Sequence, residues 1–180
     1  TRTGSVPRLM QHLSEPFVEI HPQDAQQHQI SEGDLVRVQS VTGWLVLRAQ
    51  LSAGQQRGNV FVPMHWTRQY AAQANVDMLV SPHLCPQSGQ PESKHTPVRL
   101  RRWHCDWQGI LFIRDSVTKI HAGWWARIPY PAATRYTLAA DGDPLRWLAQ
   151  QCDLSTLTLQ YAEGQGWFRR VQSQRTEIAL

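Results

Sequence analysis

The sequence lacks any long hydrophobic run and all of the common nucleotide-binding and hydrolase motifs. None of its apolar stretches approaches the ~18 residues that a membrane-spanning helix needs. It contains no G-x-x-x-x-G-K-[ST], G-x-G-x-x-G or G-x-S-x-G string, so it offers no sequence argument for a P-loop, a Rossmann domain or a nucleophile elbow. It also lacks an initiator Met and a charged-then-apolar signal segment. We therefore expect a soluble piece of a longer protein, without a membrane partner.

Metal-ligating patterns are missing as well. Cys85, Cys105 and Cys152 are 20 and 47 residues apart, so they cannot form the Cys-x-x-Cys pair of a zinc ribbon or an iron–sulfur cluster. The eight histidines are scattered without a metal-binding pair. We expect buried free thiols in a reducing compartment and no metal site within this chain.

Charge and length set further bounds. The 16 Arg and 2 Lys exceed the 14 carboxylates by a net charge of +4, and the excess is not gathered in blocks. This balance predicts an ordinary solvated surface, although arginine also suits planar contacts with phosphate or carboxylate, so an anionic ligand stays open. A chain of 180 residues with 41% hydrophobic residues allows one domain, or one compact domain with a smaller companion.

Short, β-branched runs bounded by turn formers predict strands in the first hundred residues. Val36 and Val38 alternate with polar neighbours at the period of two that a half-buried strand requires. Residues 21–27 predict a short helix, residues 31–34 a turn, and Gly43 a hairpin turn with positive φ. The predicted strands are residues 17–20, 35–40, 44–49, 59–63 and 97–101.

The composition of the sequence changes after Arg102. Six of the eight tryptophans lie in residues 103–180, and we place a domain boundary there, with a first domain at 1–102 and a second at 103–180. Residues 143–152 predict a helix that Asp141 or Asp143 caps. The second part is therefore a small, Trp-rich α+β unit. Its predicted strands are residues 109–114, 124–130, 135–139, 156–161 and 167–172.

Five segments of the first domain carry a family resemblance through their order. They are Thr1–Leu9, Glu15–Pro22, Gly33–Val38, Val62–Trp66 and Gln90–Lys94. The string resembles the C-terminal dinucleotide-binding domain of the molybdopterin oxidoreductases and is most similar to the assimilatory nitrate reductases. The resemblance covers residues 1 to about 102 and implies a double-psi β-barrel, which agrees with the strand and short-helix pattern. We therefore expect a mainly β chain, a double-psi β-barrel followed by a small α+β unit.

The resemblance also implies an activity. Enzymes of this family hold molybdenum between two molybdopterin guanine dinucleotides and transfer oxygen atoms, here reducing nitrate to nitrite with two electrons. Their 4Fe-4S cluster, metal ligand and most of the cofactor cleft belong to preceding domains, so this chain alone is expected to carry no cofactor and to be inactive. The implied partners are the remaining domains of the same reductase, nitrate, and an electron-donor protein or module, all in the cytoplasm.

The resemblance places candidate cofactor contacts at both ends of the first domain. Thr1, Arg2, Thr3 and Gly4 offer hydroxyls, a cation and backbone N–H groups, which suit the pyrophosphate of a dinucleotide. Lys94 matches the lysine that contacts the cofactor in the family. The alternatives are an unstructured chain end for residues 1–4 and an ordinary solvated lysine for Lys94.

The same resemblance places further candidates in the middle of the first domain. Met64 and His65 correspond to the segment that faces the substrate funnel, where His65 could bind an anion or could instead be a partly buried structural histidine. Asp77 stands at a cofactor-contact position where the family commonly has Asn. Cys85 stands where an Asp often precedes Pro-x-Ser.

Other functions remain open at this stage. The same domain occurs in formate dehydrogenases and in periplasmic reductases. Eight tryptophans and 16 arginines could instead serve a module that binds single-stranded nucleic acid, although aromatic residues of this kind more often form the core, so we expect no nucleic-acid partner. Residues 103–180 could also act as an adaptor that docks an electron donor.

Overall fold

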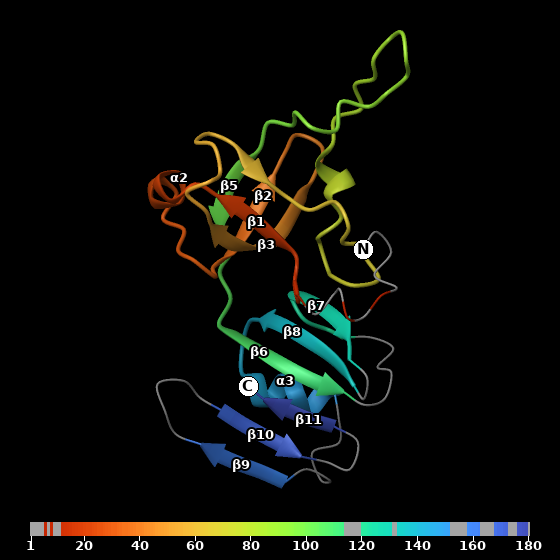
Figure 1. The fold of residues 1–180 in the computed structure, drawn as a ribbon. Coiled ribbons are helices and arrows are strands. Elements are labelled where there is room, and N and C mark those ends of the chain that lie inside the picture. Colours follow the sequence, from red (N-terminus) through yellow and green to blue (C-terminus); the bar gives the residue numbers. More distant parts are fainter. Residues whose placement is uncertain are drawn as a thin grey trace. The chain divides into compact units, whose positions relative to one another are not determined.

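The computed structural model describes residues 6, 8, 12–113, 120–130, 133–151, 158–162, 168–172 and 176–179. These residues divide into two compact units, one from Glu15 to His104 and one that contains the residues from Cys105 onward together with the described residues before Glu15 (Figure 1). Each unit contains one β-sheet, of five and six strands, and helices are few and short. The prediction of a mainly β chain is therefore confirmed.

The first unit is built on a mixed five-stranded sheet in the order β4-β1-β3-β2-β5. Strand β1 runs parallel to β3, and all other neighbouring pairs are antiparallel (Figure 1). The predicted strands and short helix are confirmed, with ends that differ by one or two residues. The double-psi crossing stays a prediction. The elements are β1 (Phe17–Ile20), α2 (Pro22–Gln27), β2 (Leu35–Gln39), β3 (Trp44–Leu51), β4 (Val60–Phe61), the 3-10 helix η1 (Val76–Leu79) and β5 (Arg99–Arg102).

The core of this unit covers both faces of its central strands, because consecutive residues of β2 and β3 are buried. Alternating aliphatic side chains of β2 and β3 point to the same side because opposite residues in an antiparallel pair share a face. Burial of such side chains contributes roughly 1.5–3 kcal/mol each and holds the sheet together. The fully buried members are Val18, Ile20, Leu35, Val36, Val38, Leu45 and Leu47.

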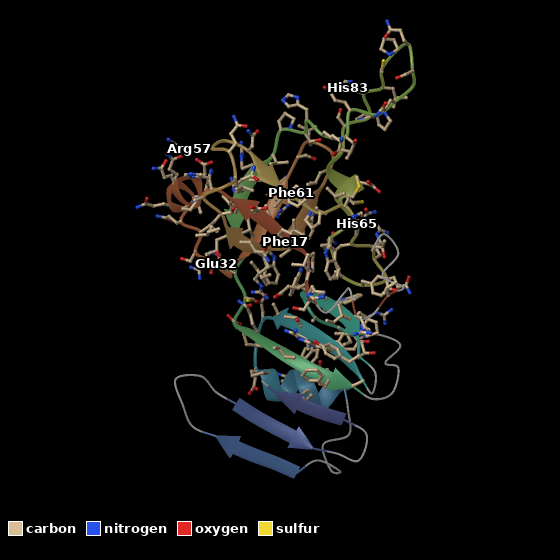
Figure 2. The ribbon with its side chains drawn as sticks, in the orientation of Figure 1. Phe17, Glu32, Arg57, Phe61, His65 and His83 are labelled. Atoms are coloured by element: carbon tan, nitrogen blue, oxygen red, sulfur yellow. The ribbon has the colours of Figure 1, made fainter. Side chains whose placement is uncertain are left out.

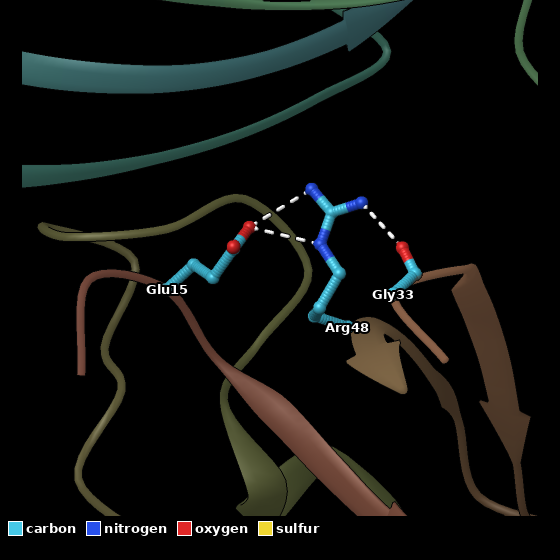
Figure 3. A network of polar contacts seen from close by, with 3 residues as sticks. All are labelled: Glu15, Gly33 and Arg48. Atoms are coloured by element: carbon cyan, nitrogen blue, oxygen red, sulfur yellow. Dashed lines mark hydrogen bonds and ion pairs between the residues drawn. The ribbon is translucent and has the colours of Figure 1, made fainter. Parts of the chain in front are cut away.

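A half-buried ion pair fixes the point where the chain enters the first strand (Figure 3). Nε and Nη2 of Arg48 donate to Oε2 of Glu15 at 3.1 and 2.9 Å, while Nη1 donates to the carbonyl oxygen of Gly33 at 2.8 Å. Gly33 has a φ of 80°, as the predicted turn before β2 requires. One guanidinium therefore joins the lead-in to β1, the strand β3 and the turn before β2.

The second unit is a six-stranded sheet in the order β7-β8-β6-β11-β10-β9. The predicted helix is confirmed, and Oδ1 of Asp143 accepts a hydrogen bond from the backbone N–H of Arg146 at 3.4 Å near its start. The tryptophan rings of Trp107 and Trp147 meet edge to face at 5.2 Å, within the core of this unit. The elements are β6 (Trp107–Ile113), β7 (Trp124–Pro129), β8 (Thr134–Ala140), α3 (Pro144–Gln151), β9 (Thr158–Ala162), β10 (Phe168–Gln172) and β11 (Thr176–Ala179).

Tryptophans contribute to the core in both units. Trp66, Trp124 and Trp147 are buried, and the other described tryptophans are half-buried. None of the tryptophans in the described ranges is fully exposed. Across those same ranges, no helix has the length and apolar character needed to cross a membrane.

The hairpin between β2 and β3 forms, but the reason predicted for its glycine is wrong. Gly43 does not adopt a positive φ. Instead, a Cβ at this position would collide with the backbone carbonyl oxygen of Met78. The glycine is required because η1 packs directly onto the hairpin, a long-range contact that the local turn sequence does not reveal.

Candidate functional site

The predicted site residues that the structure describes all lie in the first unit, outside its strands. Met64 and His65 follow β4, Asp77 lies in η1, and Lys94 lies in the segment that leads into β5. Residues 1–4 lie outside the described residues, so their predicted contacts stay predictions. The four described residues fall in two places, one around η1 and one beside α2.

The loop between β4 and η1 is anchored by a buried ring. Trp66 is only 4% exposed, whereas its neighbour Met64 is exposed. His65 is exposed as well (Figure 2). Thr67 closes the next turn, because its carbonyl oxygen accepts hydrogen bonds from the backbone N–H groups of Tyr70 and Ala71 at 2.9 and 3.0 Å. The anchor and the turn leave His65 exposed in this chain, and its predicted role toward a substrate stays a prediction.

A network of hydroxyl contacts joins η1 to the β2–β3 hairpin. Oγ1 of Thr42 donates to the carbonyl oxygen of Met78 at 3.1 Å and lies 2.8 Å from Oγ of Ser40. The Ser40 hydroxyl also accepts from the backbone N–H of Thr42 at 3.1 Å. On the other side, Nη2 of Arg68 contacts Sδ of Met78 at 3.6 Å. The loop after β4, η1 and the hairpin therefore form one connected surface, which we call the η1 face.

Asp77 is the exposed acidic group of the η1 face. Oδ1 of Asn75 accepts a hydrogen bond from the backbone N–H of Asp77 at 3.3 Å and so caps the first turn of η1. The Asp77 carboxylate itself makes no hydrogen bond or ion pair with any residue that the structure describes. It is therefore held in place by its backbone, and both of its oxygens are available to accept hydrogen bonds from a ligand.

Lys94 lines a separate hollow of about 590 Å³, which we call the Lys94 hollow. None of Met64, His65 and Asp77 lines it. Its wall also contains Thr96, whose Oγ1 is buried and has no hydrogen-bond partner among the described residues. A buried hydroxyl without a partner is costly, so this atom is poised to bind a polar group that enters the hollow.

The sequence did not point to the other polar residues of the Lys94 hollow. His28 and Asn59 line it from the end of α2 and from the start of β4. Asp24 fixes this wall, because its Oδ2 accepts from the backbone N–H of Gly58 and its Oδ1 lies 3.6 Å from Nε of Arg57. These residues are 35 or more positions from Lys94 in the sequence, so only the folded chain brings them together with it.

The segment between η1 and β5 contains a small hairpin, and it overturns the expectation of a buried Cys85. Leu84 pairs with Pro91, and the backbone N–H of Cys85 donates to the carbonyl oxygen of Gln90 at 2.9 Å. Cys85 is exposed because this hairpin has no core of its own to cover it. The side-chain and backbone hydrogen bonds of Ser88 lower the pKa of the Cys85 thiol. Cys105 is half-buried.

Metal ligands are not grouped in the described part of the chain. No three His, Cys, Asp or Glu side chains there lie close enough together to hold a metal ion.

Comparison with known proteins identifies the first unit. Residues 1–97, more than half of the chain, match the family described as molydopterin dinucleotide binding domain. The chain belongs to this family. The resemblance drawn from the five sequence segments is thereby confirmed, and the first unit is a molydopterin dinucleotide binding domain.

Individual relatives of this domain are large oxidoreductases. A nitrate reductase from Klebsiella oxytoca is 43% identical over 164 residues, covering 91% of this chain and 19% of that protein. The assimilatory nitrate reductase catalytic subunit from Bacillus subtilis is 37% identical over 86 residues, covering 48% and 12%. The alpha subunit of a formate dehydrogenase from Methanocaldococcus jannaschii is 33% identical over 102 residues, covering 57% and 14%. The chain thus spans less than a fifth of the length of these relatives.

Proposed function

We propose that this chain is the cofactor-closing part of a cytoplasmic molybdenum nitrate reductase that reduces nitrate to nitrite. The main support for this proposal is the large share of this chain that aligns with the Klebsiella enzyme. That similarity covers 91% of this chain and therefore extends well into the second unit, whereas the Bacillus and formate dehydrogenase similarities cover 48% and 57%. The combination of both units favours a nitrate reductase over the other members of the family.

The exposed groups of the first unit fit a dinucleotide. Such a ligand presents pyrophosphate oxygens, which a compact cation such as Lys94 can bind, and ring N–H groups, which a carboxylate such as Asp77 can accept. The unpartnered Oγ1 of Thr96 gives the Lys94 hollow a further polar contact for an incoming group. Because a dinucleotide is an extended molecule, different parts of it can be held at the η1 face and at the Lys94 hollow.

In the proposed enzyme, two such dinucleotides hold molybdenum, which supplies the two-electron reduction of nitrate when it is bound. The residues of this chain bind and orient. Lys94 holds an anionic group of the cofactor, Asp77 accepts hydrogen bonds from a ring edge, and residues 1–4 add hydroxyl and backbone N–H donors. The exposed imidazole of His65, beside Met64, donates a hydrogen bond to the incoming anion.

In the proposed enzyme, the different domains have different roles. Residues 1–102 close over the cofactor, and residues 103–180 form a separate Trp-rich unit. The 4Fe-4S cluster and the ligand to molybdenum are assigned to the remaining domains of the same reductase, and an electron-donor protein or module is a further partner.

The direct test is turnover by the full-length enzyme with two substrates. Purified enzyme is supplied with a chemically reduced viologen dye and nitrate, and separately with formate and the oxidised dye. We expect nitrite to form and formate to remain. The second candidate, a formate dehydrogenase, has its support in the 33% identity over 102 residues, and formate oxidation without nitrite formation would establish it in place of the nitrate reductase.

A metal analysis tests the assignment of the ligands. The isolated 180-residue chain should fold but contain no stoichiometric molybdenum or iron, because no cluster of metal ligands lies in its described part. Inductively coupled plasma mass spectrometry of the purified chain measures both metals. About one atom of either metal per chain would refute the assignment of the ligands to the other domains.

A further inference from the structure

Strand β5 is the last strand of the first sheet and pairs only with β2 in the sheet order. The backbone N–H of Trp103 donates to the carbonyl oxygen of Leu35 at 2.7 Å, which fixes the alternation of hydrogen-bonded positions along this pair. It follows that the N–H and C=O groups of Leu100 and Arg102 point away from β2. Neither residue has a backbone partner on that side among the described residues.

A groove runs along this free edge. The hollow has a volume of about 580 Å³ and is bounded on one side by the end of α2 and on the other by β5. We call it the β5 groove. Its lining residues are Gln27, His28, Gln29, Arg99–Arg102 and His104. An extended chain lying in this groove would face the unpaired backbone groups of β5.

The β5 groove carries positive charge that the chain does not neutralise. No carboxylate lines it. Arg99 and Arg101 are exposed and form no ion pair with a described carboxylate, while Arg102 lies 3.2 Å from Oδ1 of Asp34 and keeps 52% of its side chain exposed. Three arginines within four residues therefore leave at least two positive charges available to a ligand.

The neighbouring strand adds to this charge. Arg37 of β2 stands directly opposite Arg101, and like charges in opposite positions of an antiparallel pair are destabilising. The Arg37 guanidinium is held over the ring of Trp44, with 4.6 Å between its carbon and the ring centroid, and its buried Nε has no hydrogen-bond partner in the described structure. An opposing negative charge would relieve this arrangement.

We propose that the β5 groove binds an acidic, extended segment of a partner protein, which adds to the free edge of β5 as a further strand. A peptide backbone supplies the N–H and C=O groups that complete the ladder at Leu100 and Arg102, whereas a nucleic acid has no such repeating pair. Alternate side chains of the added strand fall on the same face, so acidic residues at every second position would meet Arg99 and Arg101. This inference does not rest on the proposed nitrate reductase activity.

The test measures binding of a defined peptide to the 180-residue chain. A fluorescein-labelled peptide of alternating Glu and Val is titrated with the chain, and the change in fluorescence anisotropy gives Kd. The same peptide with an N-methyl group on every backbone nitrogen has equal charge but no N–H on either edge with which to complete the ladder. Strand addition predicts that the methylated peptide binds about tenfold more weakly or worse. Equal affinity of the two peptides would overturn the proposal.

Charge reversal in the groove provides the second arm. The double variant Arg99→Glu/Arg101→Glu should weaken binding of the unmethylated peptide about tenfold or more. The matched control Arg68→Glu places a new negative charge on the η1 face and should leave Kd unchanged. Equal weakening by both variants, or tighter binding of a short oligothymidine than of the acidic peptide, would refute a peptide groove. Should the double variant not fold, the comparison of the two peptides on the unaltered chain decides the question.

Discussion

At the scale of single residues, Asp77 has a backbone held by a hydrogen bond and a carboxylate without a polar partner in the described structure. The side chain is exposed and makes no polar contact within the described structure, while its N–H is capped by Asn75. An ionised carboxylate can accept hydrogen bonds but not donate them, whereas an amide does both. A cofactor that contacts this position must therefore present donors to it.

This gives a prediction for the full-length enzyme. Asp77→Asn should keep or modestly raise nitrate turnover, because the amide still accepts hydrogen bonds and brings no charge. Asp77→Leu should lower molybdenum occupancy, because it removes all polar capacity. Metal content, turnover and Tm are measured for both variants. Full occupancy and turnover of the Leu variant, with an unchanged Tm, would make Asp77 an ordinary surface residue.

A second prediction at this scale concerns Cys85. Hydrogen bonds of Ser88 stabilise the thiolate and lower the pKa of the Cys85 thiol, so thiolate appears at a lower pH than for an ordinary cysteine. Ser88→Ala should raise this pKa and slow the reaction of Cys85 with iodoacetamide near neutral pH. At a pH above both pKa values the rates of the two proteins should converge. Mass spectrometry of the Cys85 peptide across pH measures the effect, and superimposable pH profiles would contradict it.

At the scale of elements, the contact between η1 and the β2–β3 hairpin determines which residue can occupy position 43. Gly43→Ala should destabilise the chain by roughly 1–3 kcal/mol, because the added Cβ meets the backbone carbonyl of Met78 rather than a flexible side chain. Gly54→Ala is the matched control, since its Cβ would make only an ordinary contact at 3.5 Å with Oγ of Ser52. Urea unfolding of both variants is the measurement, and equal stability would show that η1 does not pack tightly on the hairpin.

Local pattern was enough to predict most elements. The strands of the first unit, helix α2 and helix α3 could be read from β-branched runs, turn residues and a capping Asp, because these signals act over a few neighbouring positions. Strand β11 was missed because Thr176–Ala179 is a four-residue segment with no alternation to distinguish it. It becomes a strand through pairing with the preceding strand β10 and with β6, which is more than 60 residues away in the sequence.

The residues of the candidate site were harder to predict from local sequence patterns. Lys94, Asp77, Met64 and His65 were found only through a family resemblance, since no spacing rule marks them. The Lys94 hollow depends on α2, β4 and the segment before β5 meeting in space, and its polar partners Asn59 and Thr96 carry no signal in the sequence. The exposure of Cys85 was missed for a related reason, because a cysteine in a loop hairpin lacks the core that usually covers a free thiol.

At the scale of the whole molecule, the two units of the chain are similar to different sets of known proteins. The first belongs to a family shared by nitrate reductases and formate dehydrogenases, while similarity across the second is found with the nitrate reductase of Klebsiella oxytoca. The second unit has its own core around Leu138, Trp147 and Leu148.

The metal content of a Lys94 variant tests most directly whether the first unit holds the molybdenum cofactor. Lys94→Ala removes an exposed cation that costs little in folding, while a charge-assisted hydrogen bond to the cofactor contributes ~1.5–3 kcal/mol. The full-length variant should therefore retain its Tm but lose molybdenum about tenfold more readily on dialysis, and the exposed Arg146→Ala on α3 should behave like the unaltered enzyme. Identical molybdenum retention in the Lys94→Ala, Arg146→Ala and unaltered enzymes would contradict the account.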